Sequence, residues 1–308
     1  DPKLIDGIVM GECFTAMEGS LAARQVSMRL GFSERSNACV VNQNCASGMR
    51  ALDIQANNIL LGKEDIGMVI GVESMTNAPY VLEKARMGYR MGDSKIFDNM
   101  LHDGLIDELS GGHMGLTAEN VAEKYGITRE ECDKIAVRSH NLACKAIDEG
   151  IFKDEIVPVV IKTKKGEKVI TDDEHPIRGC TMETLAKLKP AFKKDGVITA
   201  ANASGINDAA AAVILMSWEK CQELGKKPMA KLVTCVAEGV APEVMGLGPA
   251  VAMPKALKAA GLKWEDIDYF EVNEAFSAQV LGVERMLKED YGYVVDWDKT
   301  NKFGSGIA

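Results

Sequence analysis

The sequence has few histidines and no paired cysteine motif, and both shortages limit its chemistry. Its 308 residues include only four histidines, at positions 102, 113, 140 and 175, and none follows a metal-ligand spacing. The eight cysteines form no Cys-x-x-Cys pair, which in a chain of this length indicates reduced cytosolic thiols, not a disulfide framework or a zinc site. We therefore predict no metal and a cytoplasmic location.

Long apolar runs and an excess of basic residues are also missing. No run approaches the roughly 20 apolar residues that a transmembrane helix needs. The net charge of −9 disfavours nucleic acid or an anionic membrane as a partner. What remains is an ordinary globular composition, 46% hydrophobic and 26% charged, in a chain long enough for two domains or one large layered domain.

Short apolar runs alternate with helical patterns, which predicts an α/β fold with a largely parallel sheet. We expect the following elements in the first part of the chain: strands at 4–10, 38–41 and 67–72, and helices at 22–30 and 49–60. Residues 76–202 differ in character and predict an insertion between strands of this sheet. Within it, Thr128 and Glu131 form a capping box that opens a helix. The α/β pattern returns at Ala200, and we expect the alanines 209–212 to be helical.

An internal echo suggests that the fold is duplicated. Residues 5–16 can be laid on residues 267–278 without a gap, and the coincident residues are Ile, Asp, Glu, Phe and Ala. Both segments precede a helical pattern. Coincidence between short α/β segments is the alternative, but the ungapped match favours two similar halves.

The segment from Val40 to Met49 is the first candidate for chemistry. Cys45 lies where a predicted strand meets the N-terminus of a predicted helix, where unpaired N–H groups and a partial positive charge favour an anion. A thiol there should lose its proton more readily than a free cysteine. Ser47 and Gly48 are small and leave room for a bulky substrate. The alternative, that Cys45 fills a gap in the core, stays open on this geometry.

Three further segments carry polar or small residues near predicted helix starts. Asn273 follows a strand expected at 269–272 and could hold a water or polarise a carbonyl, although Asn also commonly caps a helix. His113 could be a base, a ligand contact or an exposed residue without a function, and taken alone it favours the last. The run 200–208 suits either a ligand lying against the backbone or tight packing, and it lacks the Gly-x-Gly-x-x-Gly fingerprint.

Taken together, the motifs resemble the thiolase family, most closely its biosynthetic acetyl-CoA acetyltransferases, over almost the whole chain. Seven motifs follow the family's order: Asn42-x-x-Cys45-x-Ser47-Gly48, Tyr89-Arg90-Met91-Gly92, Met114-Gly115-x-Thr117-Ala118-Glu119-Asn120, Lys189-Pro190-Ala191-Phe192, Asn202-Ala203-Ser204-Gly205-x-Asn207-Asp208, Met245-Gly246-x-Gly248-Pro249 and Asn273-Glu274-Ala275-Phe276. The resemblance implies a thiolase-like five-layer αβαβα fold of two duplicated halves with an inserted loop domain that binds coenzyme A. The implied N-terminal half comprises 1–75 and 203–226, the loop domain 76–202, and the C-terminal half 227–308.

By this resemblance Cys45 would be the acyl-accepting nucleophile, and the enolate of a second acetyl-CoA would attack the acetyl-cysteine to give acetoacetyl-CoA. Asn273 would hold a water in the oxyanion hole for that enolate. The other implied site residues bind substrate: Ser204 and His113 contact the pantetheine, Leu105, Phe192 and Ala200 line its path, Met114 and Phe276 wall a short acyl pocket, and Arg178 is a candidate for the coenzyme A phosphate. The resemblance implies acetyl-CoA, acetoacetyl-CoA and CoA as partners, no separate cofactor, and a homotetramer.

The sequence departs from the family pattern near its ends. The family's Gly-His-Pro histidine and its second cysteine, the acid/base of the reaction, are expected beyond residue 308, and residues 301–306 keep only part of the lead-in to the histidine motif. We therefore expect a fragment that is inactive as given. Arg178 lies one place off the family's usual arginine. A degradative 3-ketoacyl-CoA thiolase of broader chain length and a noncatalytic acyl-CoA-binding relative remain alternatives.

Overall fold

The computed structural model describes residues 1–308 and divides into two compact units. Unit 1 comprises Asp1–Ile106 and Ile206–Cys235, and unit 2 comprises Asp107–Gly205 and Val236–Ala308. Both units are therefore discontinuous in sequence. The predicted loop domain, 76–202, contributes residues to both.

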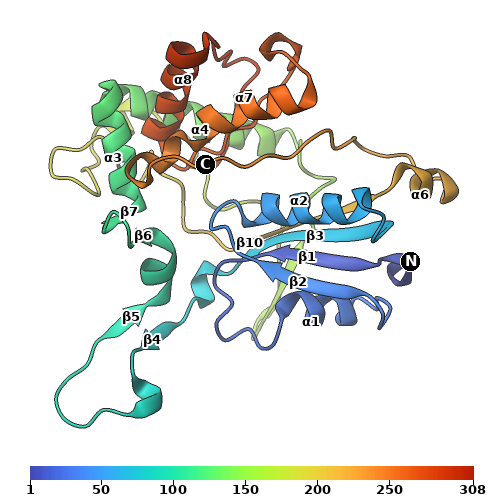
Figure 1. The fold of residues 1–308 in the computed structure, drawn as a ribbon. Coiled ribbons are helices and arrows are strands. Elements are labelled where there is room, and N and C mark those ends of the chain that lie inside the picture. Colours follow the sequence, from blue (N-terminus) through green and yellow to red (C-terminus); the bar gives the residue numbers. More distant parts are fainter. The chain divides into compact units, whose positions relative to one another are not determined.

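Unit 1 is built on a four-stranded sheet in the order β10–β3–β1–β2 (Figure 1). Its main elements are β1 (Gly7–Gly11), α1 (Ala22–Arg29), β2 (Asn37–Val41), α2 (Ser47–Leu60), β3 (Ile66–Glu73), β4 (Tyr80–Leu82), β5 (Ile96–Asp98), β10 (Ala209–Met216) and α6 (Trp218–Glu223). Strand β1 pairs in parallel with β2 and β3, while β10 runs antiparallel to β3. The prediction of a largely parallel sheet is confirmed.

Helices cover both faces of this sheet, α1 on one and α2 on the other (Figure 1). The alternation of side chains along β1 explains the arrangement. Ile8 and Met10 pack in one core cluster with Ala23 of α1, whereas Val9 packs in another with Ala51 of α2. Because both faces of β1 are covered, its five residues are all buried, as in other parallel sheets between helices.

The alanines 209–212 are not helical, so that prediction is wrong. They open β10, which pairs with β3 from Ala209 opposite Glu73 to Met216 opposite Ile66. Alanine is the best helix former, but the β-branched Val213 and Ile214 follow it, and both favour strands. The open edge of β3 offers hydrogen-bond partners along its whole length. Tertiary pairing therefore overrides the local preference of the alanines.

Unit 2 is mainly helical. Its elements are β7 (Gly112–His113), α3 (Met114–Tyr125), α4 (Arg129–Asp148), β8 (Val159–Thr163), β9 (Gly166–Ile170), α5 (Met182–Leu185), α7 (Gly248–Ala260) and α8 (Ser277–Tyr291), and the short β6 (Ile106–Asp107) lies at the unit boundary. The predicted capping box is confirmed, because Thr128 and Glu131 exchange side-chain and backbone hydrogen bonds at the start of α4. One core cluster joins α3, α4 and α8, with Val121 and Ala278 fully buried in it.

The strand expected at 269–272 is reduced to a single bridge between Phe270 and Thr300. The Phe270 N–H donates to the Lys299 carbonyl at 2.8 Å, and the Asn301 N–H donates to the Phe270 carbonyl at 3.0 Å. Two residues on, the backbone of Val272 is hydrogen-bonded by the Asn301 side chain at both its N–H and its carbonyl. At Val272 the Asn301 side chain makes the hydrogen bonds that the backbone of a neighbouring strand would make. The β-pairing that begins at Phe270 therefore does not continue.

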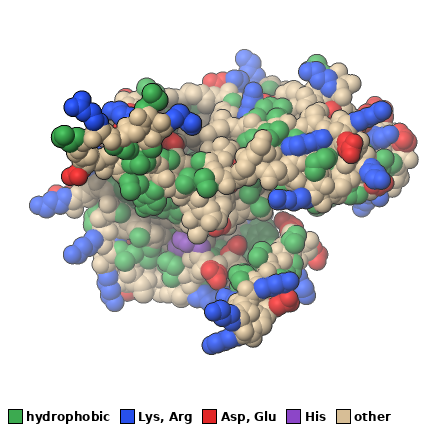
Figure 2. Space-filling model, turned by 90° about the horizontal axis from the view of Figure 1, so that it is seen from below, with side chains coloured by type: hydrophobic (Ala, Val, Ile, Leu, Met, Phe, Trp, Pro, Cys, Tyr) green, Lys and Arg blue, Asp and Glu red, His purple; other side chains and the backbone are tan.

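The charged side chains do not gather by sign on the face shown in Figure 2. Lys and Arg lie scattered there among acidic and hydrophobic side chains. An anionic ligand on this face therefore meets individual basic residues and not a continuous basic field. None of the helices combines the length and the apolar character that a bilayer crossing requires.

Candidate active site

Cys45 lies on the turn between β2 and α2, as predicted, and its side chain is exposed. The turn depends on Asn44, which adopts the left-handed backbone conformation with φ of 48°. Asn tolerates this region better than most residues with a side chain. The Asn44 carbonyl accepts hydrogen bonds from the Ser47 backbone N–H at 3.0 Å and the Ser47 hydroxyl at 2.6 Å. The thiol is thereby held two residues before the first residue of α2, and it does not fill a gap in the core.

The N-terminus of α2 packs directly on the sheet. A Cβ added to Gly11 would lie 2.3 Å from the backbone of Ser47, and one added to Gly48 would lie 3.5 Å from the Cα of Gly71. Position 11 therefore requires glycine, because any side chain would push the helix away. The ends of β1 and β3 thus fix the first turn of α2, where the unpaired backbone N–H groups of a helix collect.

Cys13 lies beside the same helix start but in a different environment. Its Sγ is 3.7 Å from the Ser47 hydroxyl oxygen. Burial raises the pKa of the Cys13 thiol to about 11, and the nearby Glu73 carboxylate acts in the same direction. Cys13 therefore stays a neutral thiol near pH 7. The exposed Cys45 is the better candidate nucleophile of the two.

A buried carboxyl group that the sequence does not predict lies close to this turn. Glu12 directly follows β1, is only 2% exposed, and leaves its Oε2 atom without a hydrogen-bond partner. Burial, together with the neighbouring carboxyl groups of Glu18 and Glu73, raises the pKa of Glu12 to about 8. Glu73 itself accepts hydrogen bonds from the backbone N–H groups that follow Glu12, at 2.8 and 3.3 Å. The internal echo between residues 5–16 and 267–278 could have drawn attention to this carboxyl group. Glu12 coincides there with Glu274, which is also buried.

In unit 2, four of the predicted substrate-binding residues lie together at the start of α3. His113 caps the helix, with its Nδ1 accepting a hydrogen bond from the Gly115 N–H at 3.0 Å. Its ring stacks on Phe192 with centroids 4.7 Å apart, and Phe192 meets Phe276 edge to face at 6.1 Å. Met114 packs against the same core cluster. The structure therefore brings His113, Met114, Phe192 and Phe276 to one place.

The cap fixes the protonation pattern of His113. Because Nδ1 accepts a hydrogen bond, the ring proton of the neutral imidazole lies on Nε2. Burial lowers the pKa of His113, which also favours the neutral ring. The stacked position requires Gly115, since a Cβ there would lie 2.3 Å from the Phe192 ring. The His113 side chain thus caps α3 and packs on Phe192, and its Nε2–H can donate a hydrogen bond to a ligand.

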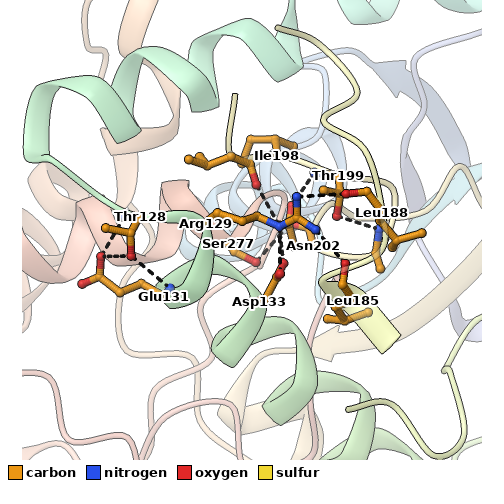
Figure 3. Close-up of polar contacts among 12 residues, drawn as sticks. Thr128, Arg129, Glu131, Asp133, Leu185, Leu188, Ile198, Thr199, Asn202 and Ser277 are labelled. Atoms are coloured by element: carbon orange, nitrogen blue, oxygen red, sulfur yellow. Dashed lines mark hydrogen bonds and ion pairs between the residues drawn. The ribbon is translucent and has the colours of Figure 1, made fainter. Parts of the chain in front are cut away.

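Ala200 and Ser204 lie in a segment without regular secondary structure. Polar contacts of Thr199 and Asn202 hold this loop in place (Figure 3). The buried Asn202 side chain accepts a hydrogen bond from the Thr199 N–H at 2.8 Å and donates one to Asp133 Oδ1 at 2.9 Å. Ala200 and Ser204 are themselves exposed. The loop therefore presents small exposed residues on a fixed backbone, as a ligand lying against it would require.

The same network extends to both neighbouring segments (Figure 3). The Asp133 carboxylate is paired with Arg129 at 2.8 Å, and Arg129 donates in turn to the carbonyls of Leu185 and Leu188. On the other side, the Asn202 carbonyl accepts hydrogen bonds from the backbone N–H and the hydroxyl of Ser277, the first residue of α8. The loop and the start of α8 are therefore linked.

Asn273 lies just before α8 with its side chain exposed. The helix begins at Ser277 and has Phe276 at its N-cap, so the capping interpretation of Asn273 is wrong. The next residue, Glu274, is fully buried. Its Oε1 accepts a hydrogen bond from Asn301 Nδ2 at 2.9 Å while its Oε2 has no partner, and burial raises the pKa of this carboxyl. The sequence predicts the burial of neither Glu274 nor Glu12.

Two predicted residues make other contacts. Arg178 is exposed and pairs with Asp148 of α4 at 2.9 Å. Leu105 belongs to unit 1, where it is half-buried in a π-helical turn, Leu101–Leu105. Their roles in coenzyme A binding stay predictions.

Comparisons with known proteins agree with this geometry. The chain matches the family models "Thiolase, N-terminal domain" over residues 1–219 and "Thiolase, C-terminal domain" over residues 226–308. An acetyl-CoA acetyltransferase of Syntrophomonas wolfei is 51% identical over 306 residues, which are 99% of this chain and 76% of the relative. A solved acetyl-CoA acetyltransferase structure from Syntrophomonas wolfei superposes with a TM-score of 0.98 at 65% identity, and that of human mitochondrial 3-ketoacyl-CoA thiolase with 0.95 at 39% identity. Each match covers 100% of this chain and 77% of the other. The predicted thiolase fold is confirmed.

Proposed function

Because the chain belongs to the thiolase family, we propose that it is an acetyl-CoA C-acetyltransferase. It condenses two acetyl-CoA molecules to acetoacetyl-CoA and CoA, and it catalyses the reverse thiolysis. The observation that carries the proposal is the exposed Cys45 thiol at the fixed start of α2. The relative of Syntrophomonas wolfei named for this activity supports it.

In the first half-reaction the Cys45 thiolate attacks the acetyl carbonyl of acetyl-CoA. A carbon–sulfur bond forms to Cys45, the bond to the coenzyme A sulfur breaks, and coenzyme A leaves as its thiolate. The N-terminus of α2 stabilises negative charge next to it through its unpaired N–H groups and its dipole. Covalent capture of the acetyl group divides one difficult condensation into two easier steps.

In the second half-reaction a general base of the enzyme takes an α-proton from a second acetyl-CoA, and the resulting enolate carbon attacks the carbonyl of the acetyl-cysteine. Cys45 leaves as a thiolate and acetoacetyl-CoA forms. The thioester oxygen carries the developing negative charge of the enolate, and Asn273 would stabilise it through a bound water. Removal of one such donor typically costs about 10²–10³ in kcat.

The aromatic cluster of unit 2 suits the pantetheine arm and the acyl group. The Nε2–H of His113 is free of the capping bond and can donate to a pantetheine carbonyl, while the exposed Ser204 can contact the same arm. Met114 and Phe276 are bulky and would restrict the acyl group to a short chain. We further propose a cytoplasmic homotetramer that uses coenzyme A thioesters without another cofactor.

The decisive experiment is to trap the acetyl-enzyme. We expect incubation of the full-length protein with acetyl-CoA, followed by digestion and mass spectrometry, to place the acetyl group on Cys45. A Cys45→Ser variant should form no acetyl-enzyme thioester, whereas the matched Cys13→Ser variant should still acetylate Cys45. Acetylation of Cys13, or no acetylation in a folded wild type, would contradict the proposal.

A chain-length series distinguishes the degradative alternative, which the 39% identity to human mitochondrial 3-ketoacyl-CoA thiolase keeps in view. We expect kcat/KM for thiolysis to be highest with acetoacetyl-CoA and to fall as the 3-ketoacyl chain lengthens. A flat or rising profile would favour a degradative thiolase. Acyl-CoA binding without any thiolysis in the full-length protein would favour a noncatalytic relative.

A further inference from the structure

We propose that Asn301 positions Asn273 for its part in the second half-reaction. The inference rests on the proposed function, because it takes Asn273 to be the oxyanion donor. Asn301 lies beyond α8 in the sequence and contacts no reacting group in the proposed reaction. It is therefore a positioning residue and not a catalytic one.

The carboxamide of Asn301 hydrogen-bonds both backbone groups of the residue before Asn273. Its Oδ1 accepts from the Val272 N–H at 2.8 Å, and its Nδ2 donates to the Val272 carbonyl at 2.8 Å. The Ser305 hydroxyl donates to the same carbonyl at 3.1 Å. These bonds fix the plane of the peptide that leads into Asn273.

The same carboxamide also holds the residue after Asn273. Its Nδ2 donates a second hydrogen bond to Glu274 Oε1 at 2.9 Å, and both side chains are fully buried. Asn273 is thus an exposed residue between two neighbours that one buried side chain holds. A water or a substrate oxygen can reach its amide, while the backbone beneath it cannot shift.

The segment after Asn301 lies against the side chain of Asn273 as well. A Cβ added to Gly306 would lie 2.6 Å from Asn273 Oδ1. Position 306 therefore brings backbone against the Asn273 amide and restricts its rotamers. The amide is confined both through its own backbone and through direct packing.

The backbone of Asn301 adopts a conformation that costs free energy. Its φ is 48°, in the left-handed region, and the residue is fully buried. Glycine would take this conformation without strain, but it would lose every contact of the carboxamide. The Asn301 carbonyl is held by Arg138 at 3.2 Å and by the Gly304 N–H at 3.2 Å. The backbone contacts of residue 301 do not require asparagine. Its advantage over glycine at this position is therefore its carboxamide.

The test is an Asn301→Gly variant of the full-length protein. It relieves the backbone strain and removes the side chain with its carboxamide, while the backbone contacts of residue 301 can be retained. We expect kcat for condensation to fall on the order of 10²-fold, since a misplacement of about 1 Å can cost that much. We expect KM for acetyl-CoA and the rate of Cys45 acetylation to stay unchanged, because Asn273 acts only after the acetyl-enzyme has formed.

A double-mutant cycle separates positioning from a merely structural role. If Asn301 acts through Asn273, the double variant Asn273→Ala/Asn301→Gly should condense no more slowly than Asn273→Ala alone. Thr128→Ala, which removes the exposed capping box of α4, is the matched destabilised control and should keep its kcat. An Asn301→Gly effect that adds in full to that of Asn273→Ala would overturn the proposal.

An Asn301→Asp variant covers the case in which the glycine variant does not fold. It retains the acceptor for the Val272 N–H and loses both donor contacts. The carboxylate oxygen that replaces Nδ2 faces the Val272 carbonyl and Glu274 Oε1, so we expect a loss of condensation kcat with KM unchanged, and a wild-type kcat would overturn the proposal. If the wild type forms no acetyl-enzyme, the proposed function fails. If the acetyl-enzyme forms and Asn301 variants condense normally, only the positioning role fails.

Discussion

The Glu12→Gln substitution should stabilise the protein at neutral pH. Glu12 is 2% exposed, its Oε2 has no partner, and its pKa is raised from 4.5 to about 8. At pH 7 the folded protein therefore keeps a proton on this carboxyl, while the unfolded chain has released it. Glutamine has the same shape, carries no charge and keeps a hydrogen-bond donor in place of the acid proton.

The sign and size of the effect follow from proton linkage. A carboxyl whose pKa is raised by folding gives its full stability below pH 4.5 and loses it as the pH rises through 8. Between these limits, Glu12 lowers the folding equilibrium constant of the wild type by up to about tenfold for each pH unit. At pH 7 the sum is about 3 kcal/mol, which is an appreciable part of a typical stability of about 5–15 kcal/mol.

Urea unfolding at pH 5, 6 and 7 measures this directly. We expect the free energy of unfolding of Glu12→Gln, relative to wild type, to increase at each step. The exposed Glu34→Gln variant is the control and should run parallel to wild type. Parallel curves for Glu12→Gln and wild type would contradict the prediction, because they would show that Glu12 is ionised in the folded protein.

Three further predictions concern other residues. Substoichiometric iodoacetamide with peptide mapping should label Cys45 before the other cysteines, and faster labelling of Cys13 would contradict its burial. Ser204→Trp should raise KM for acetyl-CoA in a protein with an unchanged circular dichroism spectrum, and an unchanged KM would move the coenzyme A path elsewhere. Burial lowers the pKa of His140, whose Nδ1 accepts from the Ile177 N–H at 3.3 Å, so its contribution to stability is present above about pH 6.5 and is lost as the pH falls. His140→Gln should reduce the loss of urea stability between pH 7.5 and 5.5, and an equal loss in both proteins would exclude this origin.

The local features that the sequence predicts best are those decided by short-range chemistry. The helix expected at 22–30 is observed as α1, Ala22–Arg29, and the capping box at Thr128 is present because its two partners are three residues apart. The placement of Cys45 at a strand–helix junction is equally local. Each of these features depends on residues that are only a few positions apart in the sequence.

The features that the sequence does not predict depend on distant partners. Nothing near Asn301 in the sequence shows that its carboxamide hydrogen-bonds Val272. Val272 precedes α8 in the chain, whereas Asn301 follows it. The burial of Glu12 and Glu274 likewise depends on the packing of several segments, and a glutamate in a short polar run is normally exposed. The prediction of a helix for the alanines of β10 is wrong for the same reason, because the edge of β3 that pairs with them is far away in the chain.

The pairing of β10 with β3 also constrains the order in which the protein can fold. Residues 74–208 separate the two strands, so a ribosome that has released β1, β2 and β3 leaves one edge of β3 unpaired until residue 216 emerges. Exposed strand edges promote association with other chains, and domains generally fold as units during synthesis. Most of the delay is occupied by Asp107–Gly205 of unit 2, in which the helices α3 and α4 make local contacts that form quickly. We therefore expect the interval between the synthesis of β3 and that of β10 to be prone to aggregation, and a longer insertion would extend it.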